Sequence, residues 1–238
     1  MEPYSLQPES VRKLFDSIAR RYDLLNHLLS LGRDIHWRKE AAHELKGLNG
    51  WFLDLATGTG DVAFETLRLG NGGRKIAGLD FSETMIRSAH RKRLKRHLQK
   101  TILLSLGDAL SLPFRDNTFT ASIVAFGLRN ISEKEKALSE MVRVTRQGGK
   151  VIILEFTLPN HGWMQRIYPF YFAKILPRVG GLISGNKGAY RYLPESVFRF
   201  QSSEDYKALM RKSGLEKVLC RSLTQGIASL MVGTKNVA

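Results

Sequence analysis

Cysteine is almost absent from this chain, whose 238 residues contain only Cys220. A single cysteine excludes an intramolecular disulfide and suits a reducing compartment. The histidines also lack the close spacing of zinc sites, because His36 and His43 lie seven residues apart, as do His90 and His97. We therefore predict neither a disulfide nor a metal site.

Long hydrophobic runs and acidic residues are also scarce. No run approaches the roughly 18 apolar residues that a membrane span requires, and the first residues, MEPYSLQPESVRKLF, lack the apolar core of a signal peptide. Acidic residues number 22 against 37 basic ones, which gives a formal net charge of +15. We expect a cytoplasmic protein whose charge leaves nucleic acid, an anionic membrane surface and an anionic ligand open as partners.

The stretch Trp51–Asp61, WFLDLATGTGD, joins an apolar run to an acidic residue, Asp54, and two glycines, Gly58 and Gly60. The run has strand character, and residues 62–70 have helical spacing. Glycines let the chain turn sharply and let a ligand approach without meeting a Cβ atom, while the helix that follows presents free N–H groups. This order predicts the first unit of a nucleotide-binding α/β fold.

The next apolar run, KIAGLD, ends on Asp80, 22 residues after Gly58. This spacing along the sequence is close to that of dinucleotide-binding proteins, in which an acidic residue after the second strand binds the hydroxyls of a ribose. A carboxylate accepts from both hydroxyls, and such charge-assisted bonds contribute roughly 1.5–3 kcal/mol each. Asp80 is therefore a candidate cofactor-binding residue.

Further strands are predicted at TILLSLGDAL, ASIVAFGLRN and KVIILEF. The second of these places Arg129 and Asn130 at the carboxyl edge of the sheet, where open parallel sheets bind ligands. A helix is predicted over 133–149, with Gly148–Gly149 ending it. After another helix at 203–213, two strands joined by a tight turn predict a carboxyl-terminal hairpin, so that one strand is antiparallel to its neighbour.

Two flanking segments have a different character. Residues 8–31 carry apolar residues at helical spacing and predict an amphipathic arm packed on the core, with a second helix over 35–45. Residues 160–185 are aromatic and apolar but are broken by Pro169 and Pro177. This insertion is compatible with a lid, a ligand channel, a membrane-contacting patch or ordinary core packing.

A strongly basic helix is predicted after its capping residue, Ser82. Its charge could be a solvated face, a contact with an anionic membrane or a nucleic-acid surface. No recognition motif or interleaved aromatic residue supports nucleic acid. The basic residues are Arg87, Arg91, Lys92, Arg93, Lys95, Arg96 and Lys100.

The glycines alone fit two cofactors. GTGDVA matches the GxGxxA form of the dinucleotide fingerprint, which is a weak signal by itself. A compact hydride-transfer enzyme would usually carry Tyr-x-x-x-Lys, and no tyrosine here has a lysine four places on. The segment DLATGTGD, the acid Asp80 and the GDA that includes Asp108 instead resemble the class I S-adenosylmethionine-dependent methyltransferases.

This resemblance implies a cofactor site. In its glycine pattern, D-x-G-x-G-x-G, this chain has Ala56 at the first glycine, and Thr57 also replaces a residue that is frequently glycine. By position, the loop around the methionine part of S-adenosylmethionine and the residues that hold its ribose and adenine would be Asp54, Gly58, Thr59, Gly60, Asp80, Phe81, Asp108 and Ala109.

More blocks resemble the ubiquinone/menaquinone biosynthesis C-methyltransferase family: FDSIARRYDLLNHLLSLG, LPFRDNTFTASIVAFGLRN, GGKVIILEF and YRYLPESV. Asp34 and Ala125 depart from residues common in that family. The resemblance implies an α/β, Rossmann-like, seven-stranded and mostly parallel sheet with the antiparallel hairpin. It also implies one domain over 1–238, comprising a helical arm (1–47), a cofactor-binding core (48–158), a lid and substrate segment (159–200) and a carboxyl-terminal helix and hairpin (201–238).

The implied reaction is methylation of a ring carbon of a polyprenylated quinol by S-adenosylmethionine, with S-adenosylhomocysteine as product. A ring carbon becomes a good nucleophile when its neighbouring hydroxyl loses a proton. Arg129 would stabilise the resulting oxygen and Asn130 would orient it. The base is open between Asp61, Tyr22 and a water bound by Arg129.

The apolar insertion, with Tyr190 and Tyr192, would hold the prenyl tail, and the basic helix would contact the inner face of the membrane. Another small-molecule substrate or RNA is the alternative. RNA methylation is disfavoured because the chain reads FGLRN where many amino-group methylases carry Asn/Asp-Pro-Pro-Tyr/Phe. Cys220 also lacks the Pro-Cys context of cytosine methylation. Benzoquinol versus naphthoquinol, tail length and homo-oligomer formation are left open.

Overall fold

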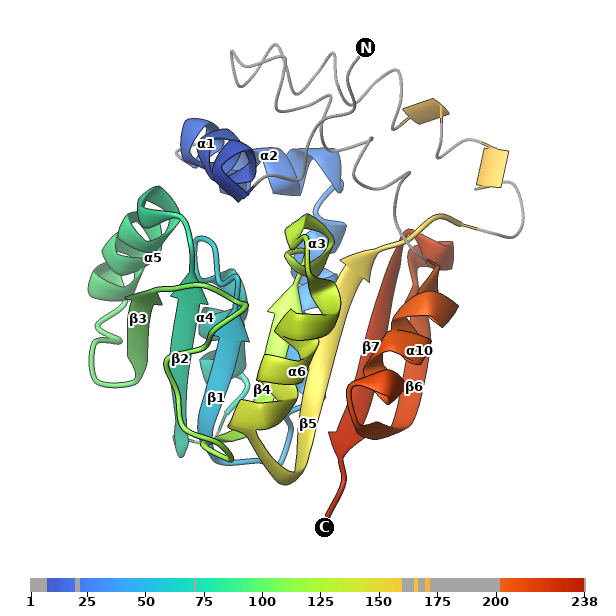
Figure 1. Ribbon diagram of the computed structural model, residues 1–238. Coiled ribbons are helices and arrows are strands. Elements are labelled where there is room, and N and C mark those ends of the chain that lie inside the picture. Colours follow the sequence, from blue (N-terminus) through green and yellow to red (C-terminus); the bar gives the residue numbers. More distant parts are fainter. Residues whose placement is uncertain are drawn as a thin grey trace.

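A seven-stranded sheet forms the centre of the molecule (Figure 1). The computed structural model describes residues 8–19, 22–70, 72–159, 165–166, 170–171 and 202–237. The strands are β1 (Gly50–Leu55), β2 (Arg74–Asp80), β3 (Ile102–Leu106), β4 (Phe119–Ala125), β5 (Thr145–Phe156), β6 (Leu215–Leu223) and β7 (Ala228–Lys235). Their order across the sheet is β3-β2-β1-β4-β5-β7-β6.

The sheet is parallel except at β7. Leu53 of β1 pairs with Ala77 of β2 on one side and with Ser122 of β4 on the other, both in parallel register. β7 runs antiparallel to both β5 and β6. The structure therefore confirms the predicted mixed sheet and its antiparallel carboxyl-terminal hairpin.

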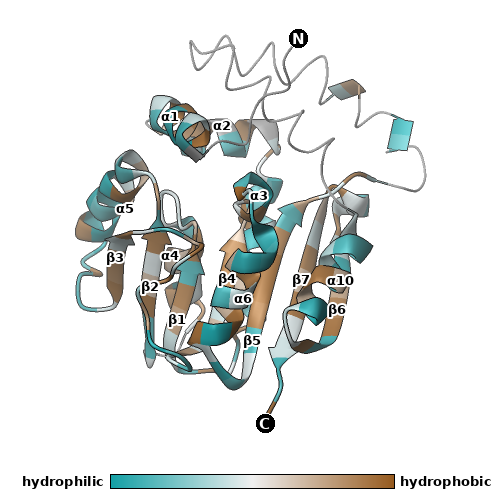
Figure 2. Ribbon diagram, viewed as in Figure 1, coloured by the Kyte–Doolittle hydropathy of each residue, from teal (hydrophilic) through white to brown (hydrophobic). Residues whose placement is uncertain are grey.

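Helices cover both faces because the central strands are apolar on both sides. Figure 2 shows brown, hydrophobic strands between helices whose teal residues face outward. On one face, Leu53 and Leu55 pack in a buried cluster with residues of α6 (Lys134–Val144) and α10 (Ser203–Lys212). On the other, Phe52 packs with residues of α3 (Arg33–His43) and α4 (Asp61–Arg68).

The predicted end of the helix before β5 is wrong. We expected the helix to continue to Gly148–Gly149, but α6 ends at Val144 and β5 begins at Thr145. The Thr145 side chain explains the early end, because its hydroxyl donates to the Met141 carbonyl and hydrogen-bonds Ser122 of β4. The β-branched sequence VRVT also favours strand over helix.

The amino-terminal arm consists of α1 (Pro8–Ile18) and α2 (Tyr22–Leu29), which lie over the carboxyl ends of the strands (Figure 1). Two carboxylates hold it there. Asp16 accepts from the hydroxyl of Ser82 at 2.6 Å, and Asp23 accepts from the hydroxyl of Thr59 at 2.6 Å. The expected lid segment, 159–200, falls almost entirely outside the described residues, as do Tyr190 and Tyr192.

Candidate functional site

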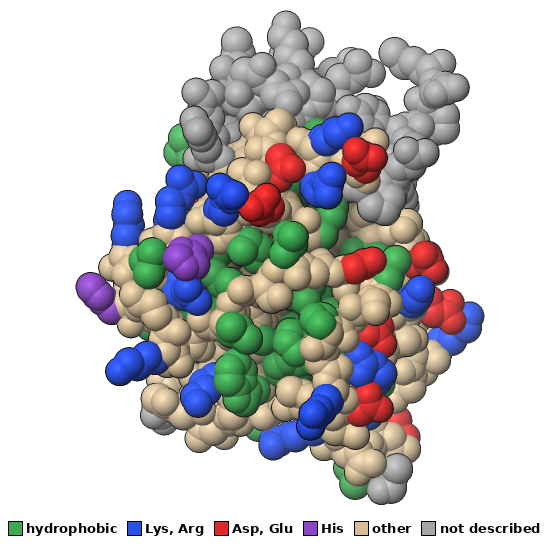
Figure 3. Space-filling view, turned by 60° about the vertical axis from the view of Figure 1, so that its left-hand side comes forward, with side chains coloured by type: hydrophobic (Ala, Val, Ile, Leu, Met, Phe, Trp, Pro, Cys, Tyr) green, Lys and Arg blue, Asp and Glu red, His purple; other side chains and the backbone are tan. Residues whose placement is uncertain are grey.

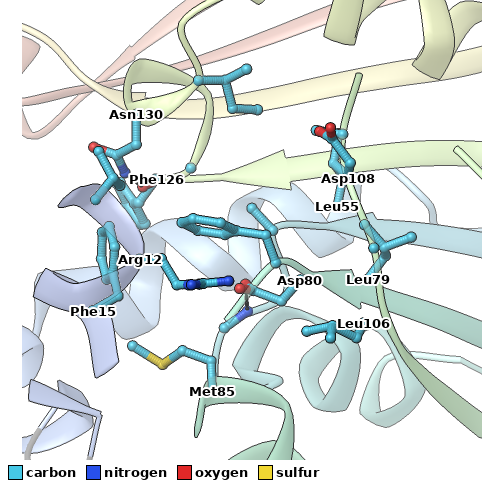
Figure 4. Close-up of a pocket in the computed structure, with 18 of the residues that line it drawn as sticks. Arg12, Phe15, Leu55, Leu79, Asp80, Met85, Leu106, Asp108, Phe126 and Asn130 are labelled. Atoms are coloured by element: carbon cyan, nitrogen blue, oxygen red, sulfur yellow. Dashed lines mark hydrogen bonds between the residues drawn. The ribbon is translucent and has the colours of Figure 1, made fainter. Parts of the chain in front are cut away.

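A cavity of about 440 Å³ opens at the carboxyl ends of β1, β2 and β4. Figure 4 shows side chains from these strand ends converging on it with side chains of the arm. Its volume lies in the usual range for a small-molecule site, roughly 300–1,000 Å³. The strand ends also form the expected ligand-binding edge of an open parallel sheet.

The glycine turn after β1 forms one wall of this cavity. Gly58 and Gly60 adopt left-handed conformations, with φ of +55° and +89°. A Cβ atom on Gly60 would lie 2.9 Å from the ring of Phe64, so the turn packs directly on α4. Gly58 lines the cavity and would meet only Tyr22, at 4.0 Å, so a ligand can approach its backbone closely.

Asp54 supports this turn from beneath. Its carboxylate accepts a hydrogen bond from the Thr57 hydroxyl at 2.6 Å, and it does not line the cavity. Burial raises the pKa of Asp54 to about 7, although the bonds from Thr57 and from the backbone of Ala63 oppose this rise. Thr57, which stands where glycine is frequent, therefore supplies a donor inside the turn.

Asp80 faces the cavity at the end of β2. Its Oδ2 accepts from the backbone N–H of Gly58 at 2.8 Å, and its Oδ1 accepts from that of Ser82 at 2.9 Å. Burial raises the pKa of Asp80 to about 6, against the lowering effect of these backbone bonds. The carboxylate thus joins the glycine turn to the start of α5 (Glu83–Lys95).

Phe81, Asp108 and Ala109 also line the cavity. The Asp108 carboxylate accepts from the backbone N–H of Leu110 at 2.9 Å. Thr59 and Gly60 do not line it; Thr59 is buried and holds Asp23 of the arm.

Arg129 lies in a buried ion pair and does not line the cavity. Its guanidinium donates to Glu155 at 2.7 Å, and its backbone N–H donates to the same carboxylate at 3.1 Å. Glu155 is fully buried at the end of β5. The sequence did not single out Glu155, because an acidic residue inside the strand KVIILEF has no spacing signal.

Asn130 and Tyr22 do line the cavity, but Asp61 does not. Burial raises the pKa of Tyr22, while Arg129 and Arg38 act in the opposite direction. Asp61 pairs with Lys92 at 2.7 Å. Burial works against its ionisation, but Lys92 and Arg38 outweigh that effect and lower the pKa of Asp61.

Helix α1 supplies a part of the cavity that the sequence did not predict. Val11, Arg12 and Phe15 line it, and in Figure 4 the guanidinium of Arg12 lies on the same side of the cavity as Asp80. The helical spacing of apolar residues predicted that α1 packs on the core. Spacing does not tell which surface a helix covers, so the contact with the cofactor region had no sequence signal.

The basic residues of α5 are partly committed to internal contacts. Lys92 pairs with Asp23 at 2.6 Å as well as with Asp61, and Arg93 donates to the Ile102 carbonyl. In Figure 3, which brings the α5 and β3 side forward, the Lys and Arg side chains are spread around this face. Within the described ranges, no helix is long and apolar enough to cross a bilayer.

Comparison with known proteins identifies the family. A model of the ubiE/COQ5 methyltransferase family matches residues 4–235. The chain belongs to this family. It is 46% identical to a demethylmenaquinone methyltransferase from Thermus thermophilus, over 93% of this chain and 100% of the relative. It is 43% identical to a ubiquinone/menaquinone biosynthesis C-methyltransferase from Geobacter sulfurreducens, over 96% of this chain and 90% of the relative.

The fold is also that of solved methyltransferases. A SAM-dependent methyltransferase from Thermotoga maritima superposes with a TM-score of 0.63 at 21% identity, covering 94% of this chain and 100% of that one. Family and fold together make the chain an S-adenosylmethionine-dependent methyltransferase. The cavity fits such a cofactor, because it combines an exposed glycine backbone at Gly58 with the carboxylate of Asp80 and the apolar Phe81.

Proposed function

We propose that this protein methylates a ring carbon of a polyprenylated quinol, converting demethylmenaquinol to menaquinol, the corresponding ubiquinone precursor, or both. The observation that carries the proposal is the near full-length similarity to relatives named for this chemistry. The apolar walls of the cavity, which include Phe15, Phe126 and Ile131, suit a flat ring next to the cofactor region.

S-adenosylmethionine would supply an electrophilic methyl group on a sulfonium. In the proposed binding mode, Asp80 accepts from the ribose hydroxyls, Asp108 and Ala109 contact the adenine, and Gly58 leaves space for the methionine part. Phe81 would add an apolar contact to the base. Asp54, Thr59 and Gly60 hold the turn in shape, and they would affect cofactor binding through the shape of the turn.

The ring oxygen would lie near Tyr22 and Asn130, which both line the cavity. Because burial raises its pKa, Tyr22 keeps its proton at neutral pH and donates a hydrogen bond to an oxygen that becomes negative. Methyl transfer would break the bond between the methyl group and the sulfonium sulfur and form a carbon–carbon bond to the ring, and the ring carbon would then release its proton to water to regain aromaticity. The ion pair with Glu155 gives Arg129 the role of fixing the Leu128–Asn130 turn that carries Asn130.

Asp61 is a weak candidate for the base, because its pKa is lowered and it lies outside the cavity. The prenyl tail would extend toward the segment with Tyr190 and Tyr192. Since such a quinol resides in a bilayer, we further propose a cytoplasmic protein that works at the inner face of the membrane. A nucleic-acid partner has no support among these contacts.

The direct test incubates the full-length protein with methyl-labelled S-adenosylmethionine and a short-tail demethylmenaquinol, kept reduced. We expect mass spectrometry to show a single ring methylation. If RNA added to the same reaction acquires the methyl label and the quinol does not, the alternative substrate is favoured. Quinone profiling of cells that lack the protein should show a demethylated quinone, and an unchanged profile would overturn the proposal.

The cofactor site is tested separately by calorimetry with S-adenosylhomocysteine. Asp80→Asn should weaken binding by at least about tenfold, because a charged acceptor is lost from the ribose. Asp116→Asn is the matched control, since Asp116 is exposed and pairs with Arg143 away from the cavity. Equal affinity of the two variants would contradict the assignment.

A further inference from the structure

A group of large apolar side chains is exposed on the arm and the start of α3. They follow one another at intervals of four, three and four residues, and are Leu24, Leu28, Leu31 and Ile35, exposed by 59%, 42%, 81% and 44%. We refer to these four residues as the α2–α3 patch. Their spacing places Leu24 and Leu28 one helical turn apart on α2, with Leu31 in the turn that follows and Ile35 in the first turn of α3.

Leu31 is the most exposed member and also has an unusual backbone. Its φ is +51°, followed by Gly32 at +72°. A left-handed conformation is uncommon for a bulky residue, and strain of this kind persists where the surrounding structure imposes it. The turn between α2 and α3 therefore holds a leucine outward at a cost in backbone energy.

A basic cavity adjoins the patch. Ile35 lines a second cavity of about 450 Å³ together with Arg38, Arg68 and Arg96. Arg96 lies over the ring of Phe64, 4.3 Å from its centroid, and has no acidic partner in the described part of the chain.

The acidic side chains of this cavity are neutralised from within the fold. Asp61 is paired with Lys92 at 2.7 Å, and Glu65 is paired with Arg68 at 2.6 Å. Both carboxylates are mostly covered, whereas the side chain of Arg68 is 59% exposed. Since Glu65 is paired with Arg68, the uncompensated charge that this surface presents to a partner is that of Arg96.

We infer that the α2–α3 patch docks on the surface of an anionic phospholipid bilayer, with its leucines in the interfacial layer and Arg68 and Arg96 against lipid phosphates. Exposed apolar residues beside arginines are the usual composition of an interfacial membrane contact. A second copy of the chain is disfavoured as the occupant, because both copies carry a net charge of +15.

The position of the patch connects docking to catalysis. Leu24 and Leu28 of the patch belong to the arm, and the arm lies over the strand ends where the 440 Å³ cavity opens (Figure 1). Docking would thus bring the cavity near the lipid phase. This consequence rests on the function proposed above, since it assumes a substrate with a polyprenyl tail.

The first test measures flotation of the full-length protein with vesicles of phosphatidylglycerol and phosphatidylcholine. Leu28→Ser/Leu31→Ser should lower the partition coefficient by about tenfold or more, as expected when two leucines no longer leave water. Leu219→Ser is the matched control, because Leu219 is 71% exposed on β6, away from the patch. Equal partition of the parent protein and the double variant would overturn the proposal.

The second test separates a specific arginine contact from general attraction by a basic protein. Arg68→Gln/Arg96→Gln and Arg115→Gln/Arg146→Gln remove the same charge, and Arg115 and Arg146 are exposed elsewhere. We expect only the first pair to weaken binding to the anionic vesicles severalfold. Equal weakening by the two pairs would refute the specific arginine contact, and equal binding of the parent to pure phosphatidylcholine would refute the preference for an anionic bilayer.

A third measurement distinguishes failure of this surface from failure of the proposed function. Leu28→Ser/Leu31→Ser should methylate a short-tail quinol in solution at the parent rate and lose activity only on a long-tail quinol in vesicles. Loss on both substrates would contradict a docking role. If sedimentation shows a parent dimer that becomes monomeric in this variant, a second copy covers the patch and the proposal is wrong.

Discussion

At the scale of single residues, the glycine turn and the loop after β4 fit together without spare space. Ala56 and Phe126 both have positive φ, +53° and +58°, which is uncommon for residues other than glycine. A Cβ atom on Gly127 would lie 2.6 Å from the Cβ of Ala56. Ala56, which replaces the first glycine of the family pattern, is therefore tolerated because Gly127, which packs against it, has no Cβ atom.

This contact predicts a coupling between the two positions. Gly127→Ala should destabilise the protein by about 1–3 kcal/mol, because two Cβ atoms cannot approach so closely. In an Ala56→Gly background the clash is absent, and the cost should fall by about 1 kcal/mol or more. Urea unfolding of both single variants and the double variant measures the coupling, and strictly additive effects would show that the two loops do not press on each other.

Asp54 predicts a pH dependence of stability. Its pKa is about 7 in the folded protein, above the ordinary value of 3.8, so the folded state keeps a proton that the unfolded state releases. The corresponding stabilisation is complete below about pH 4 and is lost as pH rises through about 7. Asp54→Asn should make the free energy of unfolding less dependent on pH between 4 and 7.

Chemical denaturation at several pH values provides the measurement. Asp116→Asn is the control, because it makes the same substitution at an exposed carboxylate. If the Asp54 variant keeps the slope of the parent protein, its carboxyl group does not carry the raised pKa.

The same residues show what the sequence could predict about the site. Asp80, Asp108 and Gly58 follow strands at fixed spacing, and the structure places all three on the cavity. The orientation of Arg129 could not be predicted, since it depends on Glu155, 26 residues away on the next strand. The sequence of one strand determines how far along the sheet a side chain lies, but contacts with other strands determine the direction in which it points.

At the scale of elements, the arm is held by charges rather than by apolar packing alone. Asp23 bonds Thr59 at the glycine turn and pairs with Lys92 of α5 at 2.6 Å. Val11 and Phe15 of α1 line the cavity below. The arm therefore closes the cofactor region by binding to the glycine turn and to α5, which themselves form part of that region.

Asp23→Ala should loosen the arm without unfolding the sheet. We expect faster hydrogen exchange over α1 and α2, and slower exchange again when S-adenosylhomocysteine fills the cavity and contacts Phe15. Glu9→Ala is the control, because Glu9 pairs with Lys13 on the exposed side of α1. Unchanged exchange in the arm of the Asp23 variant would show that this carboxylate does not anchor it.

The boundaries of elements were less predictable than their order. Each strand from β1 to β5 was expected from its apolar run, because strands buried on both faces are continuously hydrophobic. The end of α6 was misplaced, since a glycine pair resembles a helix stop whether it ends a helix or lies inside a strand. Contacts of Thr145 with Ser122, on another strand, settled the boundary, and a local pattern does not contain them.

At the scale of the whole molecule, the two edges of the sheet differ in protection. Among the strands of the described residues, β6 pairs only with β7; it has an irregular register between Glu216 and Leu219 and carries charged residues. Among the same strands β3 pairs only with β2; it has no charged residue and exposes Leu103 and Leu106 by 51% and 55%. An uncharged apolar edge strand is a template for pairing with another chain.

Net charge is what opposes such pairing at low salt. Each copy carries +15, and the screening length falls from about 10 Å at 0.1 M salt to about 3 Å at 1 M. We therefore predict that 1 M sodium chloride promotes self-association through β3, visible as faster sedimentation. Leu103→Lys should keep the protein monomeric, because it places like charges opposite each other. Leu219→Lys, on the already protected β6 edge, should associate like the parent protein. Equal behaviour of the two lysine variants would mean that β3 is not the surface involved.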